Sequence, residues 1–175
     1  KYYANGTRIW TRMAGTSLTD IANGVAVDCN SGAVYVTGYT QATLHGQTFV
    51  GNNDFFLIKY ASNGTRVWTR MVGTTGDDRG LSVSVDVSSG VVYAAGYASG
   101  TLHGQTGAGN FDVLVMKYSG NGTRIWTKLV GSTSTDIANG VLFDDLSGCV
   151  YVTGYCSGSL HGETYVSGTD IFLMK

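Results

Sequence analysis

The sequence predicts an all-β protein made of repeated, four-stranded antiparallel sheets, and three observations lead to this fold class. The 175 residues include 26 Gly, 11 Tyr and no Pro, a composition typical of strands joined by glycine-rich turns. The sequence repeats every 58 residues, with copies that begin at Lys1, Lys59 and Lys117. No segment shows the sustained 3.6-residue period of apolar side chains that indicates a helix.

The copies follow one another without insertion or deletion, so the chain divides into repeat 1 (1–58), repeat 2 (59–116) and repeat 3 (117–175). A fixed period of this kind is the mark of solenoids, propellers and arrays, in which each unit is stabilised by its neighbours. We therefore expect a single structural unit that is part of a longer or oligomeric array.

Each repeat contains four short segments rich in β-branched and aromatic residues, separated by Gly, Asn, Asp and Ser. Around the second repeat they cover 81–87, 91–98, 112–118 and 66–72, which we name strands a, b, c and d. The a–b and c–d links are short, and the Asn-Gly of the c–d link provides the positive φ angles that tight hairpins require. The predicted unit is an antiparallel a-b-c-d meander.

A single meander cannot bury both of its faces, whereas stacked copies share a core. The residues expected to pack between copies are Val25, Val27, Val34, Val36, Phe56 and Ile58 with their equivalents, together with Trp10, Trp68 and Trp126. The predicted architecture is therefore a β-propeller-like array with three blade equivalents in the chain. The repeat is longer than the roughly 40–45 residues of the commonest propeller repeat, so the links 41–53 and 15–21 should hold the surplus.

The phrases NGTRIWTRMAGT, DIANGVAVD, SGAVYVTGYT and DFFLIKY return in modified form in every repeat. They resemble the SBBP repeat family, which is named for seven-bladed β-propellers, and the resemblance covers essentially the whole chain. It implies a propeller fold, an extracellular or surface location and a binding or scaffold role, and it brings no catalytic residues. The chain departs from the family in having L-H-G where Pro-Gly is more usual.

The two ends of the chain are predicted to be complementary. Residues 8–14 should form a d strand whose c strand is reduced to residues 1–2, and residues 170–174 should form a c strand without its d strand. Three blades are too few to close a ring, since closed propellers have about four to eight. Edge pairing between chains predicts self-association, as a head-to-tail array or a six-bladed dimer. The alternative is a segment of a longer repeat polypeptide, and we favour a longer or polymeric array.

Three N-x-Thr sequons, at Asn5, Asn63 and Asn121, are candidate glycosylation sites if the protein is secreted. Each falls in the predicted c–d hairpin, where a glycan would not disturb the sheet. The alternative is that Asn-Gly is simply a favourable turn that duplication has copied.

Two sets of polar residues recur once per repeat in the longer links: His45, His103 and His161 in the phrase L-H-G, and Asp20, Asp78 and Asp136 before strand a. An up-and-down blade brings these links to the same end, so the six residues are candidates for binding a glycan or another ligand on that loop face. The alternative is a local hydrogen bond for each His and a capped turn for each Asp. Single His residues in separate blades are too far apart to share a metal ion, and we expect no metal or cofactor.

Three further sets receive structural interpretations. Residues that start the a–b links without the spacing of a calcium loop are interpreted as turn caps: Asp28, Asp86 and Asp144. Basic residues that alternate with Trp on the d strands are interpreted as protection against edge pairing, or else as a stripe for acidic polysaccharide: Arg8, Arg12, Arg66, Arg70, Arg124 and Lys128. The cysteines, at unrelated repeat positions, are interpreted as small buried residues or as one disulfide: Cys29, Cys149 and Cys156.

Several function classes are disfavoured. The net charge of −1 gives no overall attraction to nucleic acid, and no apolar run approaches the roughly 20 residues that span a bilayer. The usual phosphate-loop, metalloprotease and nucleophile-elbow motifs are missing, and near-identical blades favour no single asymmetric active site, so we expect no enzyme. The expected function is that of an extracellular or cell-surface structural or adhesive protein that assembles by blade-edge pairing into an array or filament. The alternative is a lectin-like carbohydrate-binding propeller module with one weak site per blade.

Overall fold

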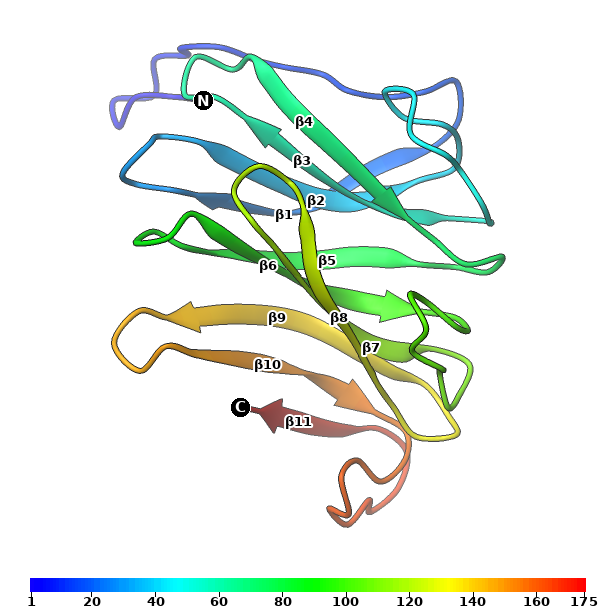
Figure 1. Ribbon diagram of the computed structural model, residues 1–175. Helices are drawn as coiled ribbons and strands as arrows, with labels where there is room; N and C mark the ends of the chain where they lie inside the picture. Colours follow the sequence, from blue (N-terminus) through cyan, green and yellow to red (C-terminus); the bar gives the residue numbers. More distant parts are fainter.

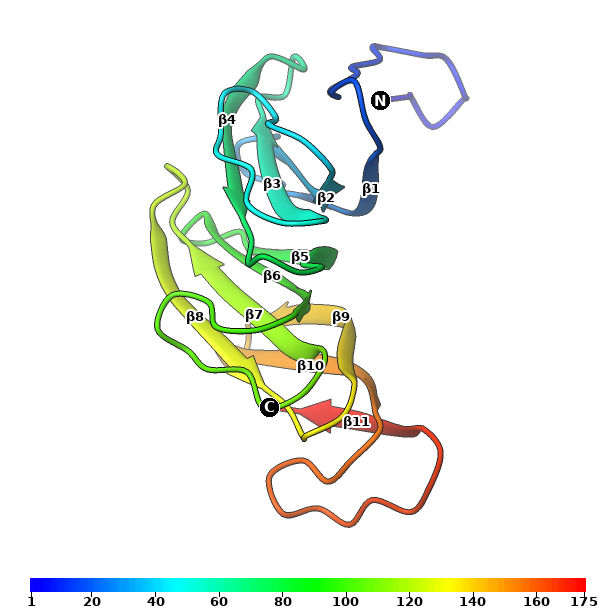
Figure 2. The same ribbon diagram turned by 90° about the vertical axis from the view of Figure 1, so that its right-hand side faces the viewer.

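The computed structural model describes all 175 residues and contains strands and turns but no helix. Three antiparallel sheets are stacked one after another, with the N-terminal segment at one end of the stack and β11 at the other (Figures 1 and 2). Blade 1 consists of β1 (Asp20–Val27), β2 (Val34–Thr40), β3 (Asp54–Tyr60) and β4 (Arg66–Val72). Blade 2 consists of β5 (Arg79–Asp86), β6 (Val91–Ala98), β7 (Asp112–Tyr118) and β8 (Arg124–Val130). Blade 3 consists of β9 (Asp136–Asp144), β10 (Cys149–Cys156) and β11 (Asp170–Met174).

The predicted all-β class and the antiparallel meander are confirmed, because the strands of each blade pair in chain order. The predicted strands 66–72, 91–98 and 112–118 coincide with β4, β6 and β7. Strand β5 begins at Arg79, two residues earlier than predicted, because a β-bulge between Gly80 and Ser82 lets pairing with β6 continue through a glycine that reads as a turn.

One predicted strand is wrong. Residues 8–14 do not form a d strand: an isolated bridge joins Tyr2 to Arg8, and Ile9 and Trp10 make backbone hydrogen bonds to Lys1. The physical reason is the lack of a partner: a ladder needs a neighbouring strand, and the preceding c strand is represented by residues 1–2 alone. This segment instead lies across the face of blade 1 (Figure 2).

The main core lies between blades 1 and 2, where β5 packs against β1, β2 and β3. The predicted packing residues of repeat 2 are all buried there: Val83, Val85, Val92, Ala94, Leu114 and Met116. A second core joins blade 2 to blade 3, where β9 packs against β5, β6 and β7. Each blade is therefore stabilised by its neighbours, as expected for a repeat array.

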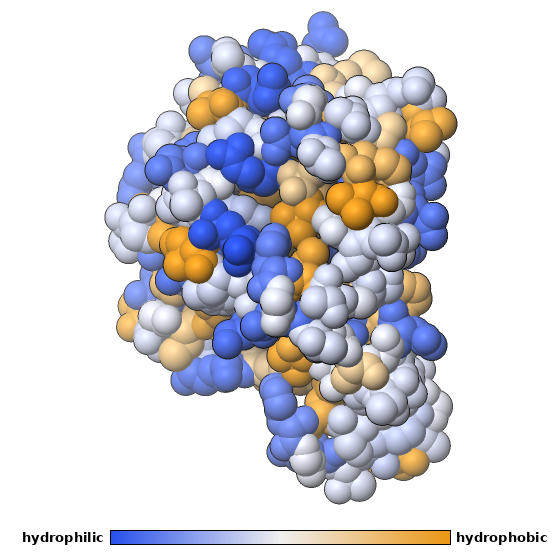
Figure 3. All heavy atoms as spheres, turned by 45° about the vertical axis from the view of Figure 1, so that its right-hand side comes forward, coloured by the Kyte–Doolittle hydropathy of each residue, from blue (hydrophilic) through white to orange (hydrophobic).

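The two outer faces of the stack expose apolar side chains. On β1, Val25 is 67% exposed and Val27 is 49% exposed, although their equivalents in blade 2 are buried. On β11, Ile171 is 91% exposed and Leu173 is 72% exposed. Separate groups of apolar residues are visible between polar ones in the space-filling view (Figure 3).

The cysteine interpretations need correction. All three thiols are free, and only Cys156 is buried, whereas Cys29 is exposed. Cys29 lies in the β1–β2 turn, where no sheet covers it. No helix in the structure has the length and hydropathy needed to cross a membrane.

Candidate functional site

The junction between blades 1 and 2 contains a set of hydrogen bonds that we call the junction contact. Lys59 Nζ and Trp68 Nε1 both donate to the carbonyl oxygen of Gly120, at 2.8 and 3.1 Å. Arg70 Nε donates to the carbonyl oxygen of Gly122 at 2.7 Å. All three donors belong to β3 and β4 of blade 1, and both acceptors belong to the β7–β8 turn of blade 2 (Figure 1).

The glycine in the turn allows this close approach. Gly122 has a φ of +83°, and a Cβ atom placed on it would lie 2.9 Å from Trp68 Cδ2. Only glycine combines this left-handed conformation with so little space. The Asn-Gly-Thr turn is therefore part of the contact with the preceding blade, and not only a hairpin at the surface.

The same contact is repeated on blade 1 by the N-terminal segment. Trp10 Nε1 donates to the carbonyl oxygen of Ser62 at 3.1 Å, and Arg12 Nε donates to that of Gly64 at 2.9 Å. Lys1 Nζ lies 3.5 Å from the Ser62 carbonyl oxygen. The segment thus occupies the place of a preceding blade's outer strand, although no such blade is present in this chain.

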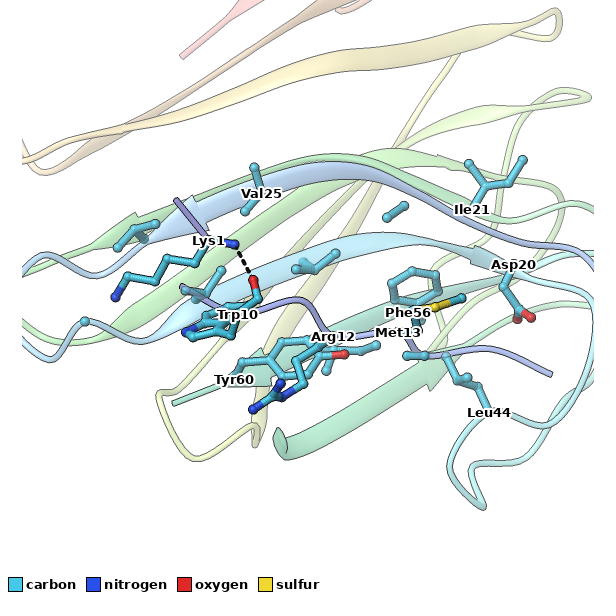
Figure 4. Close-up of a pocket in the computed structure, with 17 residues that line it drawn as sticks. Lys1, Trp10, Arg12, Met13, Asp20, Ile21, Val25, Leu44, Phe56 and Tyr60 are labelled. Carbon is cyan, nitrogen blue, oxygen red and sulfur yellow. Dashed lines mark hydrogen bonds between the residues drawn. The ribbon is translucent and has the colours of Figure 1, made fainter. Parts of the chain in front are cut away.

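A cavity of about 590 Å³ separates this segment from the sheet of blade 1 (Figure 4). Its walls are mostly apolar and include Met13, Val25, Val34, Phe56 and Ile58. At the next junction the equivalent positions of blade 2 are covered by blade 1. The cavity is therefore the space that the inner strands of a preceding blade would fill, and we call this side of blade 1 the leading face.

The opposite side of blade 3, the trailing face, has the matching composition. Blade 1 covers blade 2 with Tyr35, Phe55 and Leu57, which are fully buried. One and two periods later, the position of Leu57 is taken by Val115 and Leu173. Val115 is 7% exposed under blade 3, whereas Leu173 is 72% exposed. The trailing face thus presents the residue types that form a junction elsewhere in the chain.

Two of the three histidines lie against outer strands. His45 Nδ1 is 2.8 Å from Thr69 Oγ1 on β4, and His103 Nδ1 is 2.8 Å from Thr127 Oγ1 on β8. All three, including His161, have a positive φ of 50° to 52°, which is uncommon for a residue other than glycine. Partial desolvation and a neighbouring Arg guanidinium lower the pKa of His45 and of His103.

The aspartates before strand a occupy separate positions. Each accepts hydrogen bonds from the backbone N–H and the hydroxyl of the residue four positions earlier: Asp20 from Thr16, Asp78 from Thr74 and Asp136 from Ser132. No hydrogen bond or ion pair joins them to the histidines, and no three metal-binding side chains come together. The structure therefore does not bring the six residues into one site, and ligand binding by them stays a prediction.

The turn aspartates and the sequons also have local partners. The carboxylate of Asp28 accepts hydrogen bonds from the backbone N–H groups of Asn30 and Ser31, and these bonds, with the Ser31 hydroxyl first, lower its pKa. In the sequons the exposed Asn side chains accept a hydrogen bond from the N–H of the Thr two residues on: Asn5, Asn63 and Asn121. Glycosylation of these residues stays a prediction.

Comparison with known proteins identifies the repeat. The profile of a family described as "Beta-propeller repeat" (SBBP) matches residues 9–44 and 125–161. The chain contains SBBP repeats. Both SBBP matches run from the d segment to the L-H-G turn, and 67–102 of repeat 2 has the same pattern of residues.

One curated relative carries related sequence. The "Regulatory protein FlaEY" of Caulobacter vibrioides is 33% identical over 135 residues. The alignment covers 73% of this chain but only 14% of FlaEY, so the chain spans a small part of that relative. This similarity supports a repeat protein, and it does not extend to the activity of FlaEY as a whole.

Sequence reasoning missed the junction contact of the SBBP repeats. It placed Trp68 between blades but assigned no role to Lys59 or to the carbonyl oxygens of the Asn-Gly-Thr turn. A signal was present, because Lys, Trp and Arg keep the same spacing in repeats 1 and 2, and so does the turn that accepts their hydrogen bonds. In repeat 3 the Arg is replaced by Lys128.

Asp78 gives a prediction for pH dependence. The residue is fully buried, and burial raises its pKa to about 6. Because the pKa of Asp78 is higher in the folded than in the unfolded protein, the folded protein binds a proton at this carboxyl group more readily. Protonation of Asp78 therefore stabilises the folded state as the pH falls. We expect the unfolding free energy of the native protein, minus that of Asp78→Asn, to rise by about 2 kcal/mol from about pH 7.5 to about pH 4.5.

Urea titrations of both proteins across this pH range measure the difference. Subtracting the variant is necessary because His45 and His103, whose pKa values are lowered, act in the opposite direction. A difference that stays constant or shrinks on acidification would show that the pKa of Asp78 is not raised in the folded protein.

Proposed function

We propose that this SBBP protein is a structural scaffold that assembles with further blades of its own kind through its leading and trailing faces. The main support is that both faces carry the repeat equivalents of residues that form buried junctions inside the chain. The occupant is a blade of the same repeat, because the N-terminal segment already makes the junction contact with blade 1 in the place of a preceding outer strand.

A second copy fits this role in a specific way. Its blade 3 lacks an outer strand, and residues 8–14 of the first copy lie where that strand is needed. Blade 3 placed on the leading face would bring Ile171 and Leu173 toward the cavity and would give β11 a partner. The result is a head-to-tail array, with contacts of the type seen between blades 1 and 2.

The proposal includes an extracellular or cell-surface location and a structural or adhesive role without catalysis. It is supported by the exposed Asn of the three sequons and by the similarity of the repeats, which repeats one contact along the chain. The sequon turns lie at the junctions, where an attached glycan would influence how blades meet.

Native mass tests the assembly. We expect light scattering and negative-stain images to show particles larger than the 18.5 kDa chain at micromolar concentration. Val25→Asp and Leu173→Asp should each release the 18.5 kDa monomer, because each buries a charge in a junction. The control is Val67→Asp, an exposed apolar residue on β4 that lines neither face. A native chain that remains monomeric, or equal effects of all three variants, would contradict the proposal.

A further inference from the structure

A small basic groove lies on the outer side of the junction between blades 1 and 2. It has a volume of about 280 Å³ and is lined by Arg70 from β4, Arg124 from β8 and His103 from the β6–β7 loop, with Tyr118 among the other lining residues. No carboxylate lines this groove, and the one ion pair of the protein, between Asp77 and Arg79, is elsewhere. The positive charges of the groove therefore have no carboxylate partner within the protein.

The basic groups are held in place but keep free donors. Arg70 donates from Nε to Gly122 and from Nη1 to the carbonyl oxygen of Thr69, and its guanidinium lies 5.5 Å from the centre of the Trp68 ring. Its Nη2 makes no hydrogen bond within the protein. Arg124 makes a single long side-chain hydrogen bond, of 3.4 Å, to Thr127 Oγ1.

The histidine completes the arrangement. His103 Nδ1 contacts the same Thr127 hydroxyl, which leaves Nε2 of the ring free. The residue keeps a φ of +51°, a conformation that glycine adopts without strain. The same residue type, in the same conformation, occurs in all three repeats. Its ring is thus fixed beside Arg124 at some cost in backbone strain, as is often found at binding sites.

The same types of side chain recur one period earlier in the chain. Where the N-terminal segment meets blade 1, Arg12 donates from Nε to Gly64 and from Nη1 to Thr11, as Arg70 does one repeat later. Unlike Arg70, it also donates from Nη2 to the carbonyl oxygen of Asn63, at 3.4 Å. On blade 1, His45 and Arg66 share the hydroxyl of Thr69, at 2.8 and 3.5 Å, as His103 and Arg124 share that of Thr127. Two sets of these basic side chains, one period apart, are suited to a ligand that itself repeats.

We propose that this groove, together with the equivalent basic side chains of blade 1, binds acidic units of a carboxylated or sulfated polysaccharide. Planar guanidinium groups match carboxylate and sulfate oxygens in pairs, and a fixed imidazole is a suitable partner for a sugar hydroxyl. Nucleic acid fits less well, because single-stranded binding needs exposed aromatic faces, whereas Trp68 is 7% exposed and Tyr118 is 1% exposed. The groove between blades 1 and 2 is complete within one chain, so this proposal does not depend on assembly.

Titration calorimetry with polygalacturonate fragments and with dextran sulfate tests the site and distinguishes carboxylate from sulfate recognition. We expect at least one of the two to bind, and the double variant Arg66→Gln/Arg124→Gln to bind it about tenfold more weakly. His45→Asn/His103→Asn should also weaken binding with little change in Tm, because Asn tolerates a positive φ.

Arg8→Gln is the matched control. Arg8 has the same repeat position and is exposed, but no His or Arg from an earlier repeat faces it in this chain. Binding should therefore be unchanged in this variant. An equal loss of affinity in Arg8→Gln would mean that binding depends only on the overall positive charge of the protein, and it would overturn the proposed site. Equal binding of neutral dextran, equal or tighter binding of polyuridylate at the same ionic strength, or no binding of either acidic polymer would overturn the proposal as well.

Discussion

Replacing Leu57 with Ala is expected to lower the free energy of unfolding by about 3 kcal/mol. Leu57 is fully buried in the core between blades 1 and 2, so the substitution removes apolar contacts and leaves a cavity. The loss should appear in urea titrations followed by circular dichroism. It should also appear in the fluorescence of Trp68, which belongs to the same core.

Leu173→Ala is the matched control for this prediction. Leu173 occupies the same repeat position and is the same residue type, but it is 72% exposed on the trailing face. In dilute, monomeric protein we expect it to change the unfolding free energy by less than about 0.5 kcal/mol. Equal losses for the two substitutions would mean that blades 1 and 2 do not form the buried junction described above.

Replacing Gly122 with Ala is expected to cost about 3 kcal/mol, from two separate causes. The left-handed backbone of this residue strains any side chain, and the new methyl group would lie 2.9 Å from Trp68 Cδ2 and 3.0 Å from Arg70 Nη2. Both side chains would have to move, which breaks the junction contact. Thermal and urea unfolding of the variant measure the total.

Gly6→Ala separates the two causes. Gly6 has the same Asn-Gly-Thr context and a φ of +84°, but a methyl group there would meet nothing within 4 Å. It should therefore cost only the backbone strain, about 1 kcal/mol. If Gly122→Ala is no more harmful than Gly6→Ala, the packing of the turn against Trp68 contributes nothing to stability.

The fold was predictable from sequence because its signals are local and repeated three times. Strand positions followed from alternating β-branched residues, and the turns followed from Asn-Gly. The exposure of individual residues was less accessible, since Val25 and Val83 have the same pattern but differ in burial. That difference depends on whether a neighbouring blade is present, which sequence alternation within one repeat does not encode. The failed d strand at residues 8–14 has the same origin.

The candidate sites were less predictable. The recurrence of His103 and Asp78 in neighbouring links suggested a shared site, whereas the hydrogen bonds assign them to different places: Thr127 on the outer strand and Thr74 in the turn before β5. Arg124 was recognised only as part of a basic stripe. Its position opposite Arg70 of the preceding blade depends on how two blades pack, and that geometry became visible only in the structure.

The junction contact also gives the molecule a polarity. Its donors, Lys59, Trp68 and Arg70, always belong to the earlier blade, and its acceptor carbonyls always belong to the later one. Two identical faces therefore do not satisfy each other, and chains that join through this contact must all point the same way. Such a polymer would have chemically different ends that grow and are blocked independently, so a fragment offering only the Asn-Gly-Thr turn would stop growth at one end alone.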